Sequence, residues 1–304
     1  MYQFISQRLL QALATIIVVS IVVFLFVHLS GDPSALLLPD QATPEDIARL
    51  RAQLGLDRPL HIQYLAFMRD FWRGEALKSF RYDLPVLPLV LGALRWTLVL
   101  VGVAMLIAIV VAIPLGTVAA LTRGSLLDVA IRVLAVFGQS MPSFWVAMML
   151  MLFIAVKLKL LPVSGLGWRH AILPIATLTF FQIAVLLRLF RSEMLEVIHQ
   201  DYIRTARVKG LGETAVVYRH AFKNTAIPVV TMVGLQFSTL VTGAVVTEPI
   251  FAWPGVGFLL VNSVFLRDYP VVVGAAMVAA IIVTTVNLGV DILYSLLDPR
   301  IRLS

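Results

Sequence analysis

Long apolar runs recur through this chain of 304 residues, and they restrict its fold more than any other feature. A bilayer core about 30 Å thick is crossed by roughly 20 helical residues. Backbone amides in hydrocarbon must be paired within the segment, so runs of this length are helices. We expect an all-α polytopic membrane protein with six transmembrane helices: Leu9–Leu29, Trp96–Leu121, Val133–Val156, Ala171–Leu187, Ala226–Thr247 and Val271–Leu297. The fourth run is short, and Pro174 and Gln182 interrupt it.

Composition narrows the class further. Charged residues make up 13% of the chain, about half their share in soluble proteins. There is no cysteine, which excludes disulfides and thiolate metal sites. We attribute the net charge of +7 to loops on the cytoplasmic side and not to nucleic-acid binding. Residues 1–29 are expected to be a retained first helix, because the apolar run after Arg8 is too long for a signal peptide.

The distribution of basic residues predicts the orientation. With the N-terminus inside, twelve Lys and Arg lie on the cytoplasmic side, against four on the other side once the long first loop is set aside. The twelve are Arg8, Arg123, Arg132, Arg188, Arg191, Arg204, Arg207, Lys209, Arg219, Lys223, Arg300 and Arg302, and the four are Lys157, Lys159, Arg169 and Arg267. Both termini are then cytoplasmic.

Residues 30–95 form a large external segment between the first two spans. The stretch "TPEDIARLRAQLG" is typical of a capped helix, with Thr43 as N-cap, Pro44 in the first turn and Gly55 as the stop. Its residues Ile47, Leu50 and Leu54 share one helical face. The stretch "HIQYLAFMRDFWRG" predicts a second amphipathic helix that ends at Gly74. The segment is either a small helical cap or a docking surface for a partner.

A second external loop runs from Thr247 to Pro270. Two prolines and two glycines before Phe258 rule out a continuous helix there. A short helix over Val256–Leu266 is expected to follow. We interpret this loop as an external gate, with Glu248, Trp253 and Pro254 as its candidate residues, or as a simple connector between two helices.

No catalytic motif is present. The chain lacks the phosphate loop of nucleotide-binding proteins, H-E-x-x-H and G-x-S-x-G, and its five histidines lack metal-ligand spacing. We therefore expect a protein that is not an enzyme and that has no catalytic, cofactor or metal site of its own.

Polar residues within the spans are candidates for the lining of a translocation pathway. They are Gln139, Gln182, Gln236 and Thr239, and Met232, Gln236, Thr239 and Gly243 share one helical face. The alternative is that such residues form hydrogen bonds between helices. Asp291 lies near the cytoplasmic end of the last span, where we expect it to pair with a loop cation or to cap a neighbouring helix.

One polar stretch, "DYIRTARVKGLGETAVVYRHAFKN", lies between two apolar runs at residues 201–224. In its first half Ile203, Ala206 and Val208 supply apolar contacts, and Leu211 follows. Gly210 and Gly212 break the helix, and "ETAVVYRHAFKN" predicts a second short helix. Two short helices that meet at a glycine form a knob able to enter a groove on another protein, and Ala206 is small enough for close approach. The alternative is a charge-rich cytoplasmic loop.

This stretch resembles the cytoplasmic coupling loop of permeases from binding-protein-dependent ABC importers, especially the dipeptide/oligopeptide/nickel subfamily. "DYIRTARVKG" and "RHAFKNTAIP" carry the resemblance, as do "FLFVHLSGDP", "SMPSFWVAMMLM", "HAILPIATL" and "EPIFAWPGVGFLLVNSVFLRDYP" elsewhere in the chain. The family's general loop motif has Glu-Ala-Ala where this chain has Arg204, Thr205 and Ala206. The leading acid is therefore missing.

The resemblance implies a type I ABC importer permease fold in the cell inner membrane. Residues 1–29 would hold the first span, 30–95 the external segment, 96–297 the transmembrane domain with a coupling loop at 193–225, and 298–304 a cytoplasmic tail. The implied partners are a second homologous permease chain, two ATP-binding subunits that carry ATP and Mg, an extracytoplasmic solute-binding protein and the lipid bilayer.

For the coupling loop, the resemblance implies roles in shape for Thr205, Ala206, Gly210 and Gly212, and roles in docking for Arg204, Arg207 and Lys209. The implied function is half of an import pathway for peptides or similar small solutes. Dipeptides, oligopeptides, glutathione, nickel chelates, opines and sugars all remain open as substrates. The alternatives are an ion-coupled secondary transporter, a membrane-embedded enzyme and a scaffold for the ATP-binding subunits.

Overall fold

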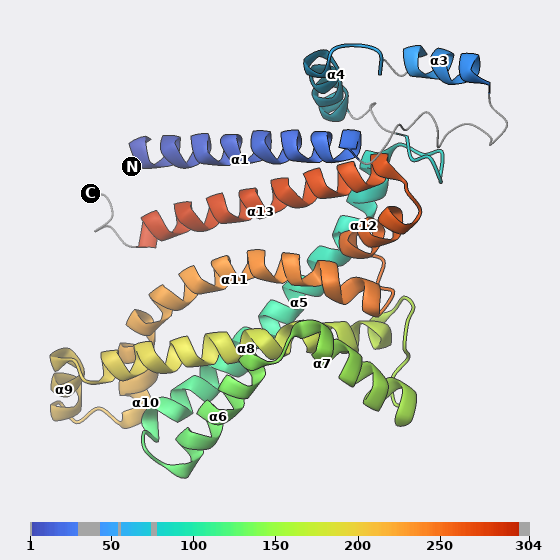
Figure 1. Ribbon diagram of the computed structural model, residues 1–304. Helices are drawn as coiled ribbons and strands as arrows, with labels where there is room; N and C mark the ends of the chain where they lie inside the picture. Colours follow the sequence, from blue (N-terminus) through green and yellow to red (C-terminus); the bar gives the residue numbers. More distant parts are fainter. Residues whose placement is uncertain (1, 30–42, 54–55, 74–77, 298–304) are drawn as a thin grey trace.

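The computed structural model describes residues 2–29, 43–53, 56–73 and 78–297, and these residues are mainly helical. The helices are α1 (Tyr2–Leu29), α3 (Pro44–Gln53), α4 (Leu60–Arg73), α5 (Val86–Leu121), α6 (Leu126–Ser140), α7 (Ser143–Leu150), α8 (Trp168–Ile198), α9 (Asp201–Val208), α10 (Glu213–Ala215), α11 (Phe222–Ile250), α12 (Val256–Phe265) and α13 (Tyr269–Leu297), with π-helical turns η1 (Met151–Lys157) and η2 (Val216–Ala221). Figure 1 shows the long helices side by side, with α9 at one end of the bundle and α12 at the other.

Five helices of the described chain are long and apolar enough to cross a membrane. They contain the segments Ile5–Phe26, Val86–Leu121, Trp168–Ile198, Pro228–Ile250 and Tyr269–Ile292. The sixth expected span is α6 together with α7 and η1, which pass the same test only as a bent pair. The six predicted apolar runs therefore all appear as helix, although their ends and the third run differ from prediction.

The third run is not one continuous helix. Its two halves meet at a bend of 100°. Met141 is extended at φ −86° and ψ 129°, and Pro142 caps α7. A residue before proline is pushed out of the helical region by the proline ring, which explains the break. The uninterrupted hydrophobicity of Val133–Val156 hid this local effect.

The fourth run is neither short nor interrupted. Helix α8 extends over 31 residues and contains both Pro174 and Gln182. It continues well past Leu187, where the predicted run ends, because charged side chains end an apolar run without ending a helix. Helix α5 likewise begins at Val86, inside the range assigned to the external segment.

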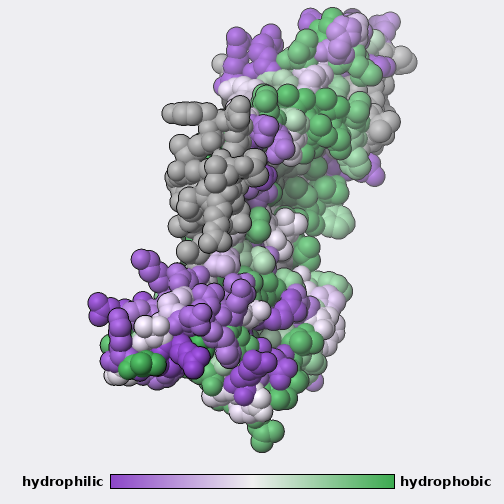
Figure 2. All heavy atoms as spheres, turned by 90° about the vertical axis from the view of Figure 1, so that its left-hand side faces the viewer, coloured by the Kyte–Doolittle hydropathy of each residue, from purple (hydrophilic) through white to green (hydrophobic). Residues whose placement is uncertain are grey.

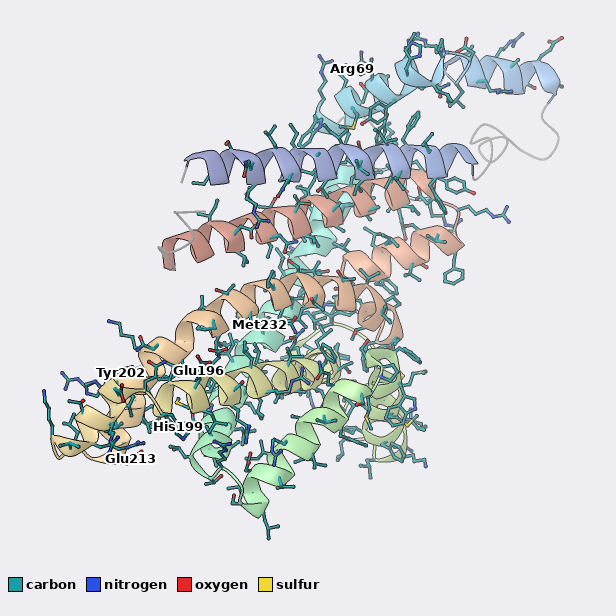
Figure 3. The ribbon with its side chains drawn as sticks, turned by 60° about the vertical axis from the view of Figure 1, so that its left-hand side comes forward. Arg69, Glu196, His199, Tyr202, Glu213 and Met232 are labelled. Carbon is teal, nitrogen blue, oxygen red and sulfur yellow. The ribbon has the colours of Figure 1, made fainter. Side chains whose placement is uncertain are left out.

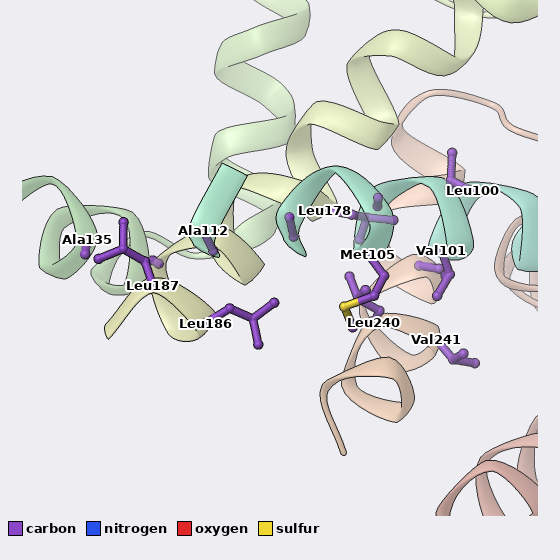
Figure 4. Packing of buried hydrophobic residues seen from close by; sticks show 14 of the residues in the cluster. Leu100, Val101, Met105, Ala112, Ala135, Leu178, Leu186, Leu187, Leu240 and Val241 are labelled. Atoms are coloured by element: carbon purple, nitrogen blue, oxygen red, sulfur yellow. The ribbon is translucent and has the colours of Figure 1, made fainter. Parts of the chain in front are cut away.

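The central core lies where α5, α8 and α11 pack together. On α5, Ala104, Ala108 and Ala112 recur every four residues and are fully buried, and Gly116 continues the row. A Cβ at Gly116 would lie 3.1 Å from the backbone oxygen of Leu187 on α8. Small residues at this spacing let two helix backbones approach closely in a membrane. Figure 4 shows the larger side chains of the same cluster, including Met105, Leu178 and Leu240.

Helices α1 and α13 lie side by side (Figure 1). Arg8 of α1 forms an ion pair of 3.1 Å with Asp291 of α13. The predicted cation partner of Asp291 therefore exists, although it comes from a helix and not from a loop.

The external-segment helices appear where they were predicted. Thr43 caps α3, because its Oγ1 accepts from the backbone N–H of Asp46 at 3.3 Å and its own N–H donates to the Asp46 carboxylate at 3.1 Å. The Thr43 hydroxyl, which donates to the Asp46 carboxylate at 2.6 Å, and the Thr43 N–H together lower the pKa of Asp46. Gly55, Gly74 and the side chains of Ile47, Leu50 and Leu54 lie outside the described residues.

Helix α12 begins at Val256, as predicted. The Glu248 side chain stabilises the turn that connects α11 to α12. Its buried carboxylate accepts from Thr97 Oγ1 at 2.6 Å and from the backbone N–H of Gly257 at 2.7 Å. A second backbone N–H, that of Phe258, lies 3.3 Å away. The carboxylate thus satisfies amides in the first turn of α12 that have no partner within the helix.

This arrangement predicts a difference between two substitutions of Glu248. Glu248→Ala leaves the Thr97 hydroxyl, the buried Gly257 amide and the partly buried Phe258 amide without this acceptor. Each unsatisfied buried group costs about 1–3 kcal/mol. Glu248→Gln keeps one acceptor oxygen and is expected to lose much less. Thermal unfolding of the purified protein measures this, and equal losses for both variants would contradict the role assigned to the carboxylate.

Candidate functional site

Helix α9 and the turn that follows it form a polar projection at one end of the bundle. Figure 2 looks at this end and shows hydrophilic residues gathered over the projection. Tyr202, His199 and Glu213 are labelled there in Figure 3. We call residues 199–213 the α9 elbow and the two ends of the bundle the α9 end and the α12 end.

The inner face of α9 is fastened to the body of this chain. Ile203 is fully buried and Ala206 is 6% exposed. Both belong to a cluster with Phe190 and Met194 of α8 and with Val216 of η2. Ala206 was predicted to allow close approach to another protein. In this structure its side chain instead packs against α8 and η2 of its own chain.

The elbow turns at Gly210. This residue has φ +79°, a left-handed conformation that glycine adopts without the penalty that a Cβ brings. Gly212 differs, because its φ is −61° and a Cβ there would meet nothing within 4 Å. Only the first of the two predicted helix-breaking glycines is therefore required by the backbone.

The second half of the polar stretch is not a separate short helix, contrary to the sequence prediction. The backbone is helical from Glu213 through α10 and η2 into α11, and the junction residues Val216 and Phe222 are in the right-handed helical region. The elbow is therefore a single short helix, α9, held between the ends of two long helices. The prediction of helix for "ETAVVYRHAFKN" is correct, but the predicted end of that helix is wrong, because the helix continues into α11.

Two side-chain contacts close the elbow. Arg207 donates to both carboxylate oxygens of Glu213, at 2.6 and 3.1 Å, across the glycine turn. The Arg207 guanidinium lowers the pKa of Glu213, and Glu213 raises that of Arg207. Asn224 of α11 donates to the Tyr202 hydroxyl at 2.6 Å. Arg207, which was predicted to dock onto a partner, is thus already engaged within this chain.

The outer face of the elbow combines basic and apolar groups. Arg204, Thr205 and Lys209 are exposed, and Thr205 Oγ1 donates to the Asp201 carbonyl at 3.0 Å. Val208 is 82% exposed and Leu211 is 42% exposed. An apolar tip with basic neighbours is a surface suited to contact another protein.

An acidic residue that was not predicted from the sequence, Asp128, joins α6 to α8. Asp128 is buried and accepts two hydrogen bonds from Arg191, at 2.7 and 2.9 Å. Arg132 lies 3.3 Å from the same carboxylate. Ser125 is the N-cap of α6 and accepts from the Asp128 N–H at 3.2 Å, so the local sequence carries a signal for a helix start. It gave no sign of the partner 63 residues away.

The residues predicted to line a pathway do not form one group. Gln236 donates to Gln182 at 2.9 Å, and Gln182 is buried, as in the alternative of an interhelical hydrogen bond. Thr239 is exposed on α11 and Gln139 is half-buried on α6. A cavity of about 490 Å³ opens between α6 and α8, lined by apolar side chains together with Ser140, Arg188 and others. A role of the four residues in transport stays a prediction.

The predicted gate residues are mostly internal. Glu248 is fully buried and Trp253 is 3% exposed. Trp253 donates to the Trp96 carbonyl at 3.3 Å, and the two rings meet edge to face. Pro254 is half-buried. These contacts fix the turn at the α12 end, and gating by it stays a prediction.

Two family models together match most of the chain. Residues 112–303 match the model described as "Binding-protein-dependent transport system inner membrane component". Residues 1–91 match the model for the N-terminal part of such membrane components.

Three full-length relatives agree with these matches. A putative peptide transport system permease of Brucella abortus (strain 2308) is 42% identical, with 98% of each chain covered. The dipeptide transport system permease DppB of Escherichia coli (strain K12) and the glutathione transport system permease GsiC of Salmonella choleraesuis (strain SC-B67) are each 40% identical, with 99% of each chain covered.

Solved structures support the fold. The MetNI methionine ABC transporter in its inward-facing form matches with a TM-score of 0.58 at 18% identity, covering 70% of this chain and 98% of that one. An amino acid ABC transporter matches with a TM-score of 0.53 at 13% identity, covering 68% and 93%. This chain is a multi-pass membrane protein that belongs to the family of binding-protein-dependent transport system inner membrane components, the permease subunits of ABC importers.

Proposed function

We propose that this chain forms half of the pathway of an ATP-driven importer and receives force from an ATP-binding subunit through the α9 elbow. The observation that supports this proposal is the two-sided character of α9. Its inner face is buried against α8 and η2, and its outer face presents Arg204, Val208 and Lys209 to solvent. A helix fixed on one side and exposed on the other is suited to pass a displacement from a partner to the bundle.

The proposed assembly contains a second homologous permease chain, two ATP-binding subunits and an extracytoplasmic solute-binding protein. ATP and Mg belong to the ATP-binding subunits, since this chain has no phosphate loop. The excess of basic residues around the elbow favours a cytoplasmic location for the α9 end and for both termini. The external segment and α12 then lie on the opposite side.

The long helices provide the path for the proposed movement. Helix α8 runs unbroken from Trp168 to Ile198, next to the elbow, and the helical backbone on the other side of the elbow continues into α11. Movement of α9 is transmitted along both helices, which meet again at the Gln182–Gln236 hydrogen bond. A rigid-body shift of packed helices of this kind is a common means of switching a site between two arrangements.

Peptides are the proposed substrate class. The relatives are named for peptide, dipeptide and glutathione transport, and each of these substrates is a short peptide or peptide-like solute. In an importer of this kind the solute-binding protein largely selects the ligand, and this chain conducts it.

Reconstitution tests the proposed function. Proteoliposomes are prepared with both permease chains and both ATP-binding subunits. They are expected to take up dipeptide only when ATP is present on the side of the ATP-binding subunits and the solute-binding protein is present on the opposite side. Vesicles with this chain alone are expected to show no uptake driven by a proton gradient. Uptake by the chain alone under that gradient would establish the alternative, an ion-coupled secondary transporter.

Two glycine substitutions test the shape of the elbow. Gly210→Ala forces a Cβ into the left-handed region, which costs about 1–2 kcal/mol, whereas Gly212→Ala meets no neighbour and keeps an ordinary backbone. We expect Gly210→Ala to reduce uptake per ATP hydrolysed and Gly212→Ala to leave this ratio unchanged. Equal coupling ratios in the two variants would show that the turn at Gly210 is not needed.

A substitution at the tip tests docking. Burial of a valine side chain contributes about 1.5–3 kcal/mol, so Val208→Asp is expected to weaken binding of the ATP-binding subunits roughly tenfold or more. Phe265→Asp is the control, because Phe265 is also exposed, at 81%, but lies at the α12 end. Copurification of the ATP-binding subunits measures the effect. Full retention by the Val208 variant would place the docking contact elsewhere.

A further inference from the structure

Helix α4 packs sideways against the last turns of α1. The Tyr64 hydroxyl and the Ser20 hydroxyl share a hydrogen bond of 2.7 Å. The ring of Phe24 lies 5.5 Å from that of Tyr64 and 5.9 Å from that of Phe67, centroid to centroid. Figures 1 and 3 both show α4 next to the end of α1, on the side of α1 away from α13.

These contacts fix the depth of α4 relative to a membrane. Ser20 and Phe24 both belong to the apolar segment Ile5–Phe26, which is long enough to span. They lie within its last two turns, so Ser20 is about 9 Å from the end of the segment at 1.5 Å per residue. Helix α4 is therefore next to the end of this span, where we expect hydrocarbon to meet the headgroups of one leaflet, at the α12 end.

The face of α4 opposite these contacts has the composition of an interfacial helix. Ile62, Leu65 and Trp72 are 39%, 63% and 63% exposed. Their spacing places them on one side of the helix together with Arg69, which pairs with the adjacent Asp70 at 2.7 Å. Figure 3 shows Arg69 on the side of α4 away from α1. Tryptophan and arginine beside leucine and isoleucine are typical of helices that lie in the plane of a membrane surface.

Another side of α1, away from its contacts with α4, is also apolar and exposed. Val18, Ile21, Val22 and Leu25 are between 39% and 58% exposed on a helix that packs mainly against α13. A spanning helix of this kind presents such side chains to lipid. The exposed face of α4 therefore belongs to a helix that packs on a span with lipid-facing side chains of its own.

We propose that α4 is a membrane-surface helix, whose exposed face of Ile62, Leu65 and Trp72 lies in the headgroup boundary of the leaflet at the α12 end. The bilayer is the occupant of this face, and not the solute-binding protein. Between the two interpretations of the external segment, the proposal assigns α4 to anchoring and leaves the polar helix α3 available for contact with a soluble partner. It does not depend on ATP coupling or on substrate.

The absence of cysteine from the chain makes a direct test available. Single cysteines are placed at Leu65 and Trp72 and labelled with a nitroxide in the assembled transporter, in nanodiscs of phosphatidylethanolamine and phosphatidylglycerol. Collision of the label with oxygen, which concentrates in lipid, is compared by electron paramagnetic resonance with collision with a water-soluble nickel chelate. Val18→Cys is the lipid-facing control, and Arg49→Cys on α3 is the water-facing control, since both residues are exposed.

The proposal predicts oxygen-to-nickel collision ratios at positions 65 and 72 that are severalfold above the ratio at 49 and close to that at 18. Ratios like that at position 49 would place the face in water and overturn the proposal. Low collision with both reagents would show that protein covers the face and would also overturn it, as would protection that appears only when the solute-binding protein is added. Leu65→Ser, with the label at position 72, provides a second variant. Because serine removes apolar surface from the proposed lipid-facing side, the oxygen-to-nickel collision ratio at position 72 is expected to fall.

Discussion

The burial of Ile203 and Ala206 against α8 and η2 is the contact on which the rest of this account depends. Without it α9 would be a polar segment tethered at both ends, and force on its surface would be lost in local motion. With Ile203 fully buried and Ala206 nearly so, the helix is part of the packed body. The Arg207–Glu213 pair and the left-handed turn at Gly210 then fix how the elbow returns to the bundle.

The same logic explains why the helices exceed what a bilayer requires. Helix α8 has 31 residues, whereas roughly 20 suffice to cross the hydrocarbon. The additional turns carry Arg191, which joins α6 through Asp128, and Phe190 and Met194, which hold α9. Close packing of α8 on the alanines of α5 connects this projecting end to the centre of the chain.

The sequence allowed the spanning helices, α3, α4 and α12 to be predicted because their signals are local. The length of the apolar runs predicts the spans, and Thr43 marks the start of α3. The prolines and glycines around Trp253 indicate that the helix is interrupted before α12. The bend at Pro142 is also a local effect, but hydrophobicity on both sides concealed it. The partners of Asp128, Glu248 and Arg207 depend on how helices meet, and residue spacing along one helix carries no such information. Ala206 shows the same limit: its small size indicated close approach, and only the fold shows that the approach is to its own chain.

The most direct test of this account asks whether α9 moves as one body with α8 during the ATP cycle. Asp201→Cys on α9 and Ser192→Cys on α8, both exposed positions outside the proposed docking tip, carry nitroxide labels in the assembled transporter, and double electron–electron resonance reports the distance between them. The account predicts one narrow distance distribution whose position is the same without nucleotide and with ATP trapped. A distribution that shifts or broadens on ATP binding would mean that the elbow moves independently of the bundle, and it would contradict the claim that α9 transmits force.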